Sequence, residues 1–124
     1  MEVSGMAVTF QQENDRLAVM RVSGLLKKSE MDAAQAAAAK QWDPQSRVKV
    51  LVIVENFEGW EGGVDWGDMS FYAEHGDKME KIAIIGDPKR EADLLMFMGA
   101  GIRPSPIKFF PLGQAAQARA WLGN

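Results

Sequence analysis

Hydrophobic residues are most concentrated in the middle of the chain. From Val48 to Val54, only Lys49 interrupts a run of valine, leucine and isoleucine. A segment without a polar face is typical of a strand that is covered on both sides, as in parallel sheets. The stretch that follows, Glu55–Gly63, is rich in carboxylate, aromatic and glycine residues. We therefore predict a central strand that leads directly into a loop.

Shorter apolar segments, separated by turn residues, predict the other elements. Glu13-Asn14-Asp15 indicates a tight turn between two strands, and Asp87-Pro88 is typical of a helix start. We expect Gly24 to end the second strand and Gly99–Pro106 to form a loop. The predicted strands are Met6–Gln12, Arg16–Ser23, Arg47–Val54, Lys81–Gly86 and Ile107–Phe110, and the predicted helices are Ser29–Gln41, Val64–His75, Pro88–Met98 and Gln114–Leu122.

The first predicted helix has an alanine-rich core face. Ser29 followed by Asp32 resembles a capping box at its start. Because alanine has little side-chain volume, this helix can lie close to the sheet. The expected core residues are Met31, Ala34, Ala38 and Trp42.

The order of the elements predicts the fold class. After the first hairpin, strands and helices alternate along the chain. This alternation is typical of right-handed crossovers in a mostly parallel sheet. We expect an α/β fold whose sheet has one antiparallel edge strand. A length of 124 residues with 47% hydrophobic composition suits a single domain over residues 1–124.

Composition narrows the classes of function and the compartment. The chain has no cysteine, which excludes disulfides and thiolate metal sites and makes the cytoplasm the expected location. Its start lacks a signal-peptide pattern, and no apolar run approaches the roughly 20 residues that a membrane-spanning helix needs. A net charge of −3 provides no basic surface for a phosphate backbone. We therefore expect neither a membrane span nor a nucleic-acid partner.

Several short motifs, in this order and at this spacing, resemble the SpoIIAA-like family. This family has the STAS-type fold, named after anti-sigma-factor antagonists, which is also compared with the CRAL-TRIO lipid-binding domain. The resemblance covers nearly the whole chain and implies a five-stranded mixed sheet, in roughly sequential strand order, with four helices. The motifs are Phe57-Glu58-Gly59, Trp66-Gly67-Asp68, KIAIIGD over 81–87, KFFP over 108–111 and ARAWL over 118–122.

The resemblance implies little about activity. Anti-sigma-factor antagonists carry a phosphorylated serine where a central strand meets its helix. Here the corresponding junction, Glu55–Gly63, contains neither serine nor threonine, and the nearest hydroxyl belongs to Ser70. The phosphorylation switch is therefore not carried over. Two functions remain for such a domain: binding a protein partner, or binding a lipid or another apolar small molecule.

Aromatic residues gather in and after the predicted loop. Five of them lie within sixteen residues, more than one helix face can bury. Such a cluster could line an apolar pocket or form an interaction hot spot, because each ring removes ~150–250 Å² from water. The alternative is that the rings only cap the end of the sheet. The cluster consists of Phe57, Trp60, Trp66, Phe71 and Tyr72.

Leu94–Met98 is a second candidate surface. These five consecutive apolar residues, which include Phe97, cover more than half the circumference of a helix. A sheet-facing stripe needs only about three or four apolar residues in two turns. Because methionine-rich surfaces are adaptable, we expect this surface to contact a ligand or a second subunit of a homodimer. The alternative is that Ile102 and the proline-containing loop cover it.

Other chemistry finds little support. An acidic run lacks the spacing of a calcium loop, and the single histidine, His75, is more typical of a helix cap than of a general base. No nucleotide-binding, hydrolase or metalloprotease motif occurs. Catalysis would depend on a carboxylate such as Glu55 in the aromatic pocket. The acidic residues are Glu55, Glu58, Glu61, Asp65 and Asp68.

The main hypothesis is a non-enzymatic domain without cofactor or metal. It would bind an apolar small molecule or lipid in a pocket built from the aromatic loop and the Leu94–Met98 helix. The alternative is a module whose regulatory protein partner docks on those surfaces. The candidate site residues are Phe57, Trp60, Trp66, Phe71, Tyr72, Leu94, Phe97 and Met98.

Overall fold

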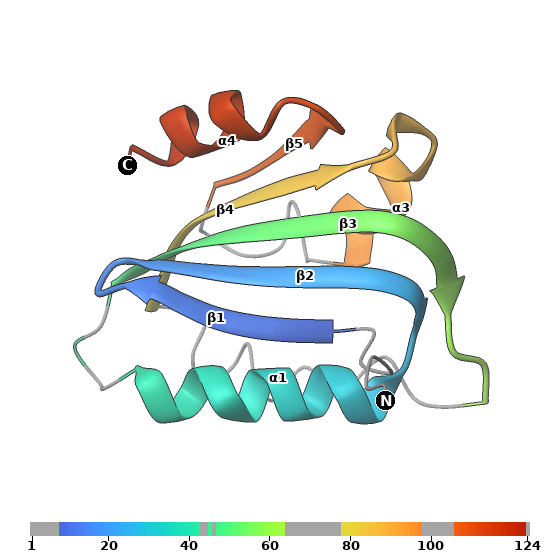
Figure 1. Ribbon diagram of the computed structural model, residues 1–124, viewed down its shortest axis with the longest axis horizontal. Helices are drawn as coiled ribbons and strands as arrows, with labels where there is room; N and C mark the ends of the chain where they lie inside the picture. Colours follow the sequence, from blue (N-terminus) through green and yellow to red (C-terminus); the bar gives the residue numbers. More distant parts are fainter. Residues whose placement is uncertain (1–7, 43–44, 46, 64–77, 98–105, 124) are drawn as a thin grey trace, which may run out of the picture.

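Five strands form one mixed sheet in the order in which they occur in the chain, β1-β2-β3-β4-β5 (Figure 1). β1 and β2 are antiparallel, whereas β2, β3, β4 and β5 are parallel to one another. This confirms the predicted α/β fold with one antiparallel edge strand. The strands are β1 (Val8–Asn14), β2 (Leu17–Leu26), β3 (Val48–Trp60), β4 (Met79–Gly86) and β5 (Ile107–Pro111).

Three α-helices and one 3-10 turn lie in the part of the chain that the computed structural model describes, residues 8–42, 45, 47–63, 78–97 and 106–123. Four helices were predicted, and the one expected over Val64–His75 lies outside these residues. The observed helices are α1 (Lys28–Gln41), the 3-10 turn η2 (Pro88–Arg90), α3 (Glu91–Phe97) and α4 (Ala115–Leu122).

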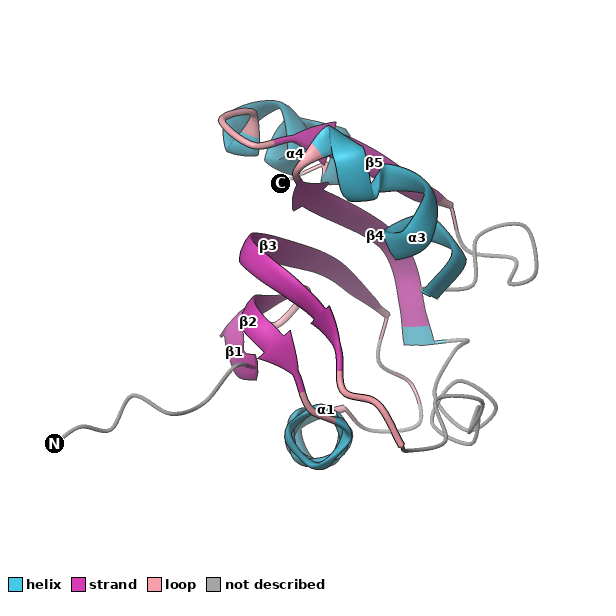
Figure 2. Cartoon of the chain, turned by 90° about the vertical axis from the view of Figure 1, so that its right-hand side faces the viewer, coloured by secondary structure: helices cyan, strands magenta, loops and turns pink. Residues whose placement is uncertain are grey.

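The two faces of the sheet carry separate hydrophobic layers. Residues of α1 and Leu94 of α3 pack on one face, whereas Ala118 and Leu122 of α4 pack on the other. Figure 2 shows α1 end-on against its face of the sheet, with α4 on the opposite side. Leu51 in β3 and Ile84 in β4 are completely buried. The apolar run of β3 is thus covered on both sides, as its sequence predicted.

The central strand extends six residues beyond its predicted end, because β3 continues through Trp60. Its pairing with β4 ends at Ile53↔Ile85, and beyond that point it pairs only with β2. The polar and glycine residues after Val54, which we interpreted as a loop, instead belong to an irregular strand with a left-handed backbone at Asn56 (φ 52°) and at Gly59 (φ 114°). Figure 1 shows this end of β3 curving away from β4.

The second strand is also longer than predicted. Gly24 does not end β2, which runs on to Leu26. The pairing with β3 shifts register on both sides of Gly24, whose φ is +66°. A residue without a side chain adopts this backbone at little cost, so the glycine marks a bulge rather than a strand end. The two bulged strands together form a ribbon that extends beyond β4.

The core face of α1 is as predicted, but its start is not. Lys27 is the N-cap and makes no side-chain capping bond, so the capping box of Ser29 and Asp32 is wrong. Glu61 Oε1 instead accepts a hydrogen bond from the backbone N–H of Lys28 at 3.0 Å. The predicted core residues Met31, Ala34, Ala38 and Trp42 are all buried.

The predicted helix start at Asp87 and the predicted hairpin turn can both be compared with the structure. Asp87 caps η2 as predicted, since its Oδ1 accepts a hydrogen bond from the backbone N–H of Lys89 at 3.0 Å. The hairpin turn lies later than predicted, at Asp15 and Arg16, because β1 continues through Asn14. There Asn14 Oδ1 accepts a hydrogen bond from the backbone N–H of Arg16 at 2.9 Å, the local bond that asparagine makes in turns.

Candidate ligand-binding site

Three aromatic rings meet where the extended end of β3 approaches α3. The Phe57 and Trp60 rings are edge to face, with 4.9 Å between centroids. The Trp60 and Phe97 rings are tilted by 53° with 5.5 Å between centroids. This geometry falls in the range in which aromatic pairs stabilise beyond their buried area. We call Phe57, Trp60 and Phe97 the aromatic cluster.

Two irregularities in β3 place the aromatic cluster on the face that carries α1. Val52 and Val54 point into the core layer on that face, and Phe57 and Trp60 pack against the same layer after the irregularity at Asn56. A regular alternation would have placed Phe57 on the side of Glu55. The pairing with β2 skips Asn56, which brings Phe57 to this face, and then skips Glu58, which keeps Trp60 on it.

An outer cleft opens beside the aromatic cluster. Its volume is about 300 Å³, it is shallow and broadly open to solvent, and Trp60, Asp93, Met96 and Phe97 line it. Met96 is 76% exposed and has the largest exposed fraction among the large hydrophobic residues that the structure describes. The neighbouring Leu94 is only 5% exposed and belongs to the core. One face of α3 therefore anchors the helix, while Met96 and Phe97 line the cleft.

Beneath the aromatic cluster lies a small inner cavity of about 20 Å³, which has room for roughly one water molecule. Trp60 and Phe97 line both this cavity and the outer cleft. Every described side chain around the inner cavity is apolar: Met20, Val22, Leu26, Met31, Val52, Val54, Phe57, Trp60, Ile84, Leu94 and Phe97.

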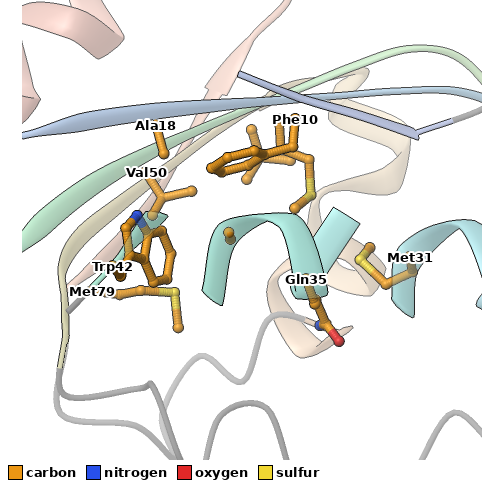
Figure 3. Close-up of a pocket in the computed structure, with 10 residues that line it drawn as sticks. Phe10, Ala18, Met31, Gln35, Trp42, Val50 and Met79 are labelled. Carbon is orange, nitrogen blue, oxygen red and sulfur yellow. The ribbon is translucent and has the colours of Figure 1, made fainter. Parts of the chain in front are cut away.

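A third space, the α1 cavity, lies between α1 and the sheet (Figure 3). Its volume is about 30 Å³, and it shares Met20, Met31 and Val52 with the inner cavity. Our sequence analysis did not predict it. Its walls come from five separate segments, and only the contrast between small alanines on α1 and the large Trp42 could have indicated incomplete filling. The lining residues are Phe10, Ala18, Met20, Met31, Gln35, Ala38, Trp42, Val50, Val52 and Met79.

The two indole groups on this face differ in their hydrogen bonding. Trp42 Nε1 donates to Gln12 Oε1 at 3.0 Å. Trp60 Nε1 is buried, and the described part of the chain offers it no acceptor. Buried polar groups in proteins are nearly always paired, and an unpaired one costs roughly 1–3 kcal/mol. Trp60 is therefore an unusual member of an otherwise apolar wall.

Charged groups surround the aromatic cluster without entering it. The guanidinium carbon of Arg90 lies 5.2 Å from the centroid of the Phe57 ring. Asp93 is exposed at the rim of the outer cleft. The interior of the site is therefore apolar, and its rim is polar.

The structure brings four of the eight predicted site residues together. Phe57, Trp60, Leu94 and Phe97 all surround the inner cavity. The remaining predictions, Trp66, Phe71, Tyr72 and Met98, lie outside the described residues.

The hypothesis that Glu55 acts as a carboxylate inside the aromatic pocket is wrong. Glu55 is exposed and lies opposite Ser23 in the pairing of β2 with β3. Strand alternation places its side chain on the opposite face of the sheet from Val54. Among the described residues, no group of three or more metal-ligating side chains occurs. No described helix has the length and apolar character needed to cross a membrane.

The sequence profile of the SpoIIAA-like family matches residues 17–123. This chain belongs to the SpoIIAA-like family. The match spans four of the five strands together with α1, α3 and α4. The resemblance in the sequence motifs is thus confirmed. A search of the curated proteins finds no match.

A solved structure has the same fold as this SpoIIAA-like chain. It is the crystal structure, at 2.25 Å resolution, of an uncharacterised protein of the DUF3478 family with a SpoIIAA-like fold from Shewanella loihica PV-4. The two chains are 18% identical, with a TM-score of 0.69 over 98% of this chain and 97% of the other. At this level of identity the likeness concerns the fold alone.

Proposed function

We propose that this SpoIIAA-like protein binds an apolar small molecule in the outer cleft beside the aromatic cluster, and that it does so without catalysing a reaction. The observation that carries the proposal is the cleft of about 300 Å³ walled by Trp60, Met96 and Phe97. This volume reaches the lower end of the range for small-molecule pockets, ≈300–1,000 Å³. Two aromatic rings and a thioether chain are suitable walls for a hydrocarbon body.

Exposure of Met96 supports a ligand at this place. An exposed methionine beside two rings is apolar area that an apolar molecule would remove from water. Such burial stabilises a complex by roughly 25 cal/mol per Å² of apolar surface. The carboxylate of Asp93 at the rim could accept a hydrogen bond from a polar group of the ligand at the mouth of the cleft.

The neighbouring cavities give the site room to adapt. The outer cleft, the inner cavity and the α1 cavity are linked by shared walls, through Trp60 and Phe97 and then through Met20 and Met31. Methionine side chains have three flexible bonds and readily repack. A longer ligand, such as a lipid chain, would extend from the cleft along the sheet by displacing these side chains.

A second candidate function uses the same surface. Met96 would then be part of the contact with a regulatory protein or with the second subunit of a cytoplasmic homodimer. The exposed position of Met96 on α3 favours this alternative. Exposed methionines are frequent at adaptable protein-binding surfaces. The two candidates differ in whether a small molecule alone occupies the cleft.

Titration with N-phenyl-1-naphthylamine, a neutral probe that fluoresces in apolar surroundings, tests the proposal. We expect saturable binding to the full chain and at least fivefold weaker binding to Met96→Glu, which places a charge on the cleft wall without disturbing a buried residue. Leu112→Ala is the control, because Leu112 is an exposed hydrophobic residue that does not line the cleft. Equal affinity in all three proteins, or a signal that does not saturate, would contradict the proposal.

Sedimentation of the same proteins examines the second candidate. If Met96 lies in a subunit contact, Met96→Glu converts a dimer to a monomer while Leu112→Ala does not. A dimer that is unaffected by Met96→Glu, together with saturable probe binding, would leave the small-molecule site as the function of this surface.

A further inference from the structure

One charged group, the carboxylate of Asp93, belongs to the described wall of the outer cleft. Trp60, Met96 and Phe97 form the rest of that wall. Asp93 precedes Met96 by three positions and Phe97 by four on α3, so these three side chains lie on one face of the helix. The cleft therefore places a carboxylate beside two aromatic rings and a thioether.

No described cation neutralises this carboxylate. Asp93 is exposed, and none of the ion pairs in the described part of the chain includes it. Arg90, three positions earlier, instead has its guanidinium carbon 5.2 Å from the centroid of the Phe57 ring, which does not line the outer cleft. A positive charge beside Asp93 would thus have to come from a ligand.

The aromatic walls suit a ligand of the same charge. The face of an aromatic ring carries negative charge density and attracts cations, and quaternary ammonium groups are often bound in this way. In the described part of the chain, a lysine or arginine lies over each of the rings of Phe57, Phe110 and Trp121. No described lysine or arginine lies over the ring of Trp60.

We propose that the ligand of the outer cleft is an apolar molecule with an ammonium group, which lies against the aromatic walls and beside the carboxylate of Asp93. The inference rests on the proposed function, since it specifies the chemistry of the molecule that the cleft binds. The cleft is shallow and open to solvent. An ammonium group at its mouth therefore keeps part of its water, which makes its desolvation cost small.

Anions and inorganic cations fit the cleft less well. Asp93 would repel a carboxylate or a phosphate at the mouth. A divalent metal ion needs several protein ligands, whereas the described residues contain no group of three or more metal-ligating side chains. One carboxylate is enough for an organic cation, because apolar contacts with the walls supply the rest of its affinity.

Two ligands of nearly the same shape isolate the effect of the charge. Phenyltrimethylammonium has a quaternary nitrogen where tert-butylbenzene has a carbon atom. Each competes with N-phenyl-1-naphthylamine for the full chain, for Asp93→Asn and for Glu91→Gln. Glu91→Gln is the matched control, because it removes the same charge from the same helix at an exposed residue that does not line the cleft.

At low ionic strength, we expect Asp93→Asn to weaken phenyltrimethylammonium binding about threefold to fivefold and tert-butylbenzene binding less than about 1.5-fold. The effect is modest because the carboxylate is exposed to solvent. Glu91→Gln should change the binding of either ligand by less than about 1.5-fold. Sodium chloride at about 0.5 M should reduce the effect of Asp93→Asn, because salt screens the interaction of the two charges.

The contradicting outcomes separate this inference from the proposed function. If Asp93→Asn affects both ligands equally or neither of them, the ammonium inference is overturned, and the apolar site stands. An equal loss of phenyltrimethylammonium binding in Glu91→Gln would show a general effect of net charge, with the same consequence. The inference is also overturned if phenyltrimethylammonium does not displace a bound probe. If neither the probe nor either ligand binds, both the inference and the proposed function fail.

Discussion

The side chain of Glu61 caps the start of α1, with 3.0 Å between Glu61 Oε1 and the backbone nitrogen of Lys28. The backbone N–H of Glu61 in turn donates to the carbonyl oxygen of Leu26 at 2.8 Å. One residue thus joins the end of β3 to the connection between β2 and α1. Trp60 directly precedes Glu61, so this cap also holds the aromatic cluster in place.

Removing this cap should destabilise the fold. Glu61→Ala leaves an N–H of the first turn of α1 without this acceptor, and we expect a loss of about 1 kcal/mol in the free energy of unfolding. Glu61→Gln, which keeps an oxygen acceptor, should lose less. Urea denaturation followed by circular dichroism measures both. Glu58→Ala is the control, because Glu58 is an exposed carboxylate on the same strand; an equal effect there would contradict the capping role.

Substitutions at Leu94 and Met96 should affect different properties: the first lowers stability, and the second weakens probe binding. Leu94 is buried in the core, and Leu94→Ala should cost about 2–5 kcal/mol. Met96 is largely exposed, and Met96→Ala should change stability by less than about 0.5 kcal/mol while weakening probe binding. Thermal unfolding and probe titration of both variants check this. Similar unfolding temperatures for the two variants would contradict the assignment of α3 faces.

Gly59 should be required for the end of β3. Its φ of +114° is strained for any residue with a Cβ, although a Cβ there would meet no atom within 4 Å. We expect Gly59→Ala to cost about 1–3 kcal/mol through backbone strain alone. Gly62 also has open space around it but no left-handed φ, so Gly62→Ala should be nearly neutral. Equal stability of the two variants, measured by denaturation, would contradict this explanation.

Glu13 and Arg119 link β1 to α4 and should make stability depend on pH. Their side chains form two hydrogen bonds of 2.8 and 3.0 Å. The hydrogen bond from Arg119 lowers the pKa of Glu13 below its ordinary value of 4.5. The folded state therefore favours the carboxylate, and the stabilisation is complete above pH 4.5 and lost as the pH falls through the lowered pKa.

An NMR titration of the Glu13 carboxyl group measures this effect. Its midpoint should lie below 4.5 in the unmodified protein and should rise in Arg119→Ala. A Glu13 midpoint that is unaffected by Arg119→Ala would exclude the bidentate pair in solution.

Much of the fold could be predicted from the sequence because local signals and burial agree. The uninterrupted apolar run of β3 and the Met31, Ala34, Ala38 pattern of α1 each predict one structure. Asp87-Pro88 predicts a cap that the structure contains. The extensions of β2 and β3 could not be predicted, because pairing between two bulged strands outweighs the turn preference of Gly24 and Gly59.

The candidate site was predictable only in part. The aromatic and Leu94–Met98 segments were singled out from composition, and four of their residues indeed meet. The α1 cavity arises from packing among five segments, which no local pattern encodes. The long-range cap by Glu61 was likewise missed, since Ser29 and Asp32 provided a nearer and more familiar signal. The unpaired N–H of Trp60 depends on three-dimensional contacts and has no sequence signal.

Native mass spectrometry of gently purified protein tests the central claim most directly, because it reports retained small molecules and subunit number together. We expect a species carrying one apolar molecule of a few hundred daltons, which is lost from Met96→Glu and kept by Leu112→Ala. A bare protein mass in all three, under conditions that preserve other protein–ligand complexes, would contradict a ligand-binding cleft.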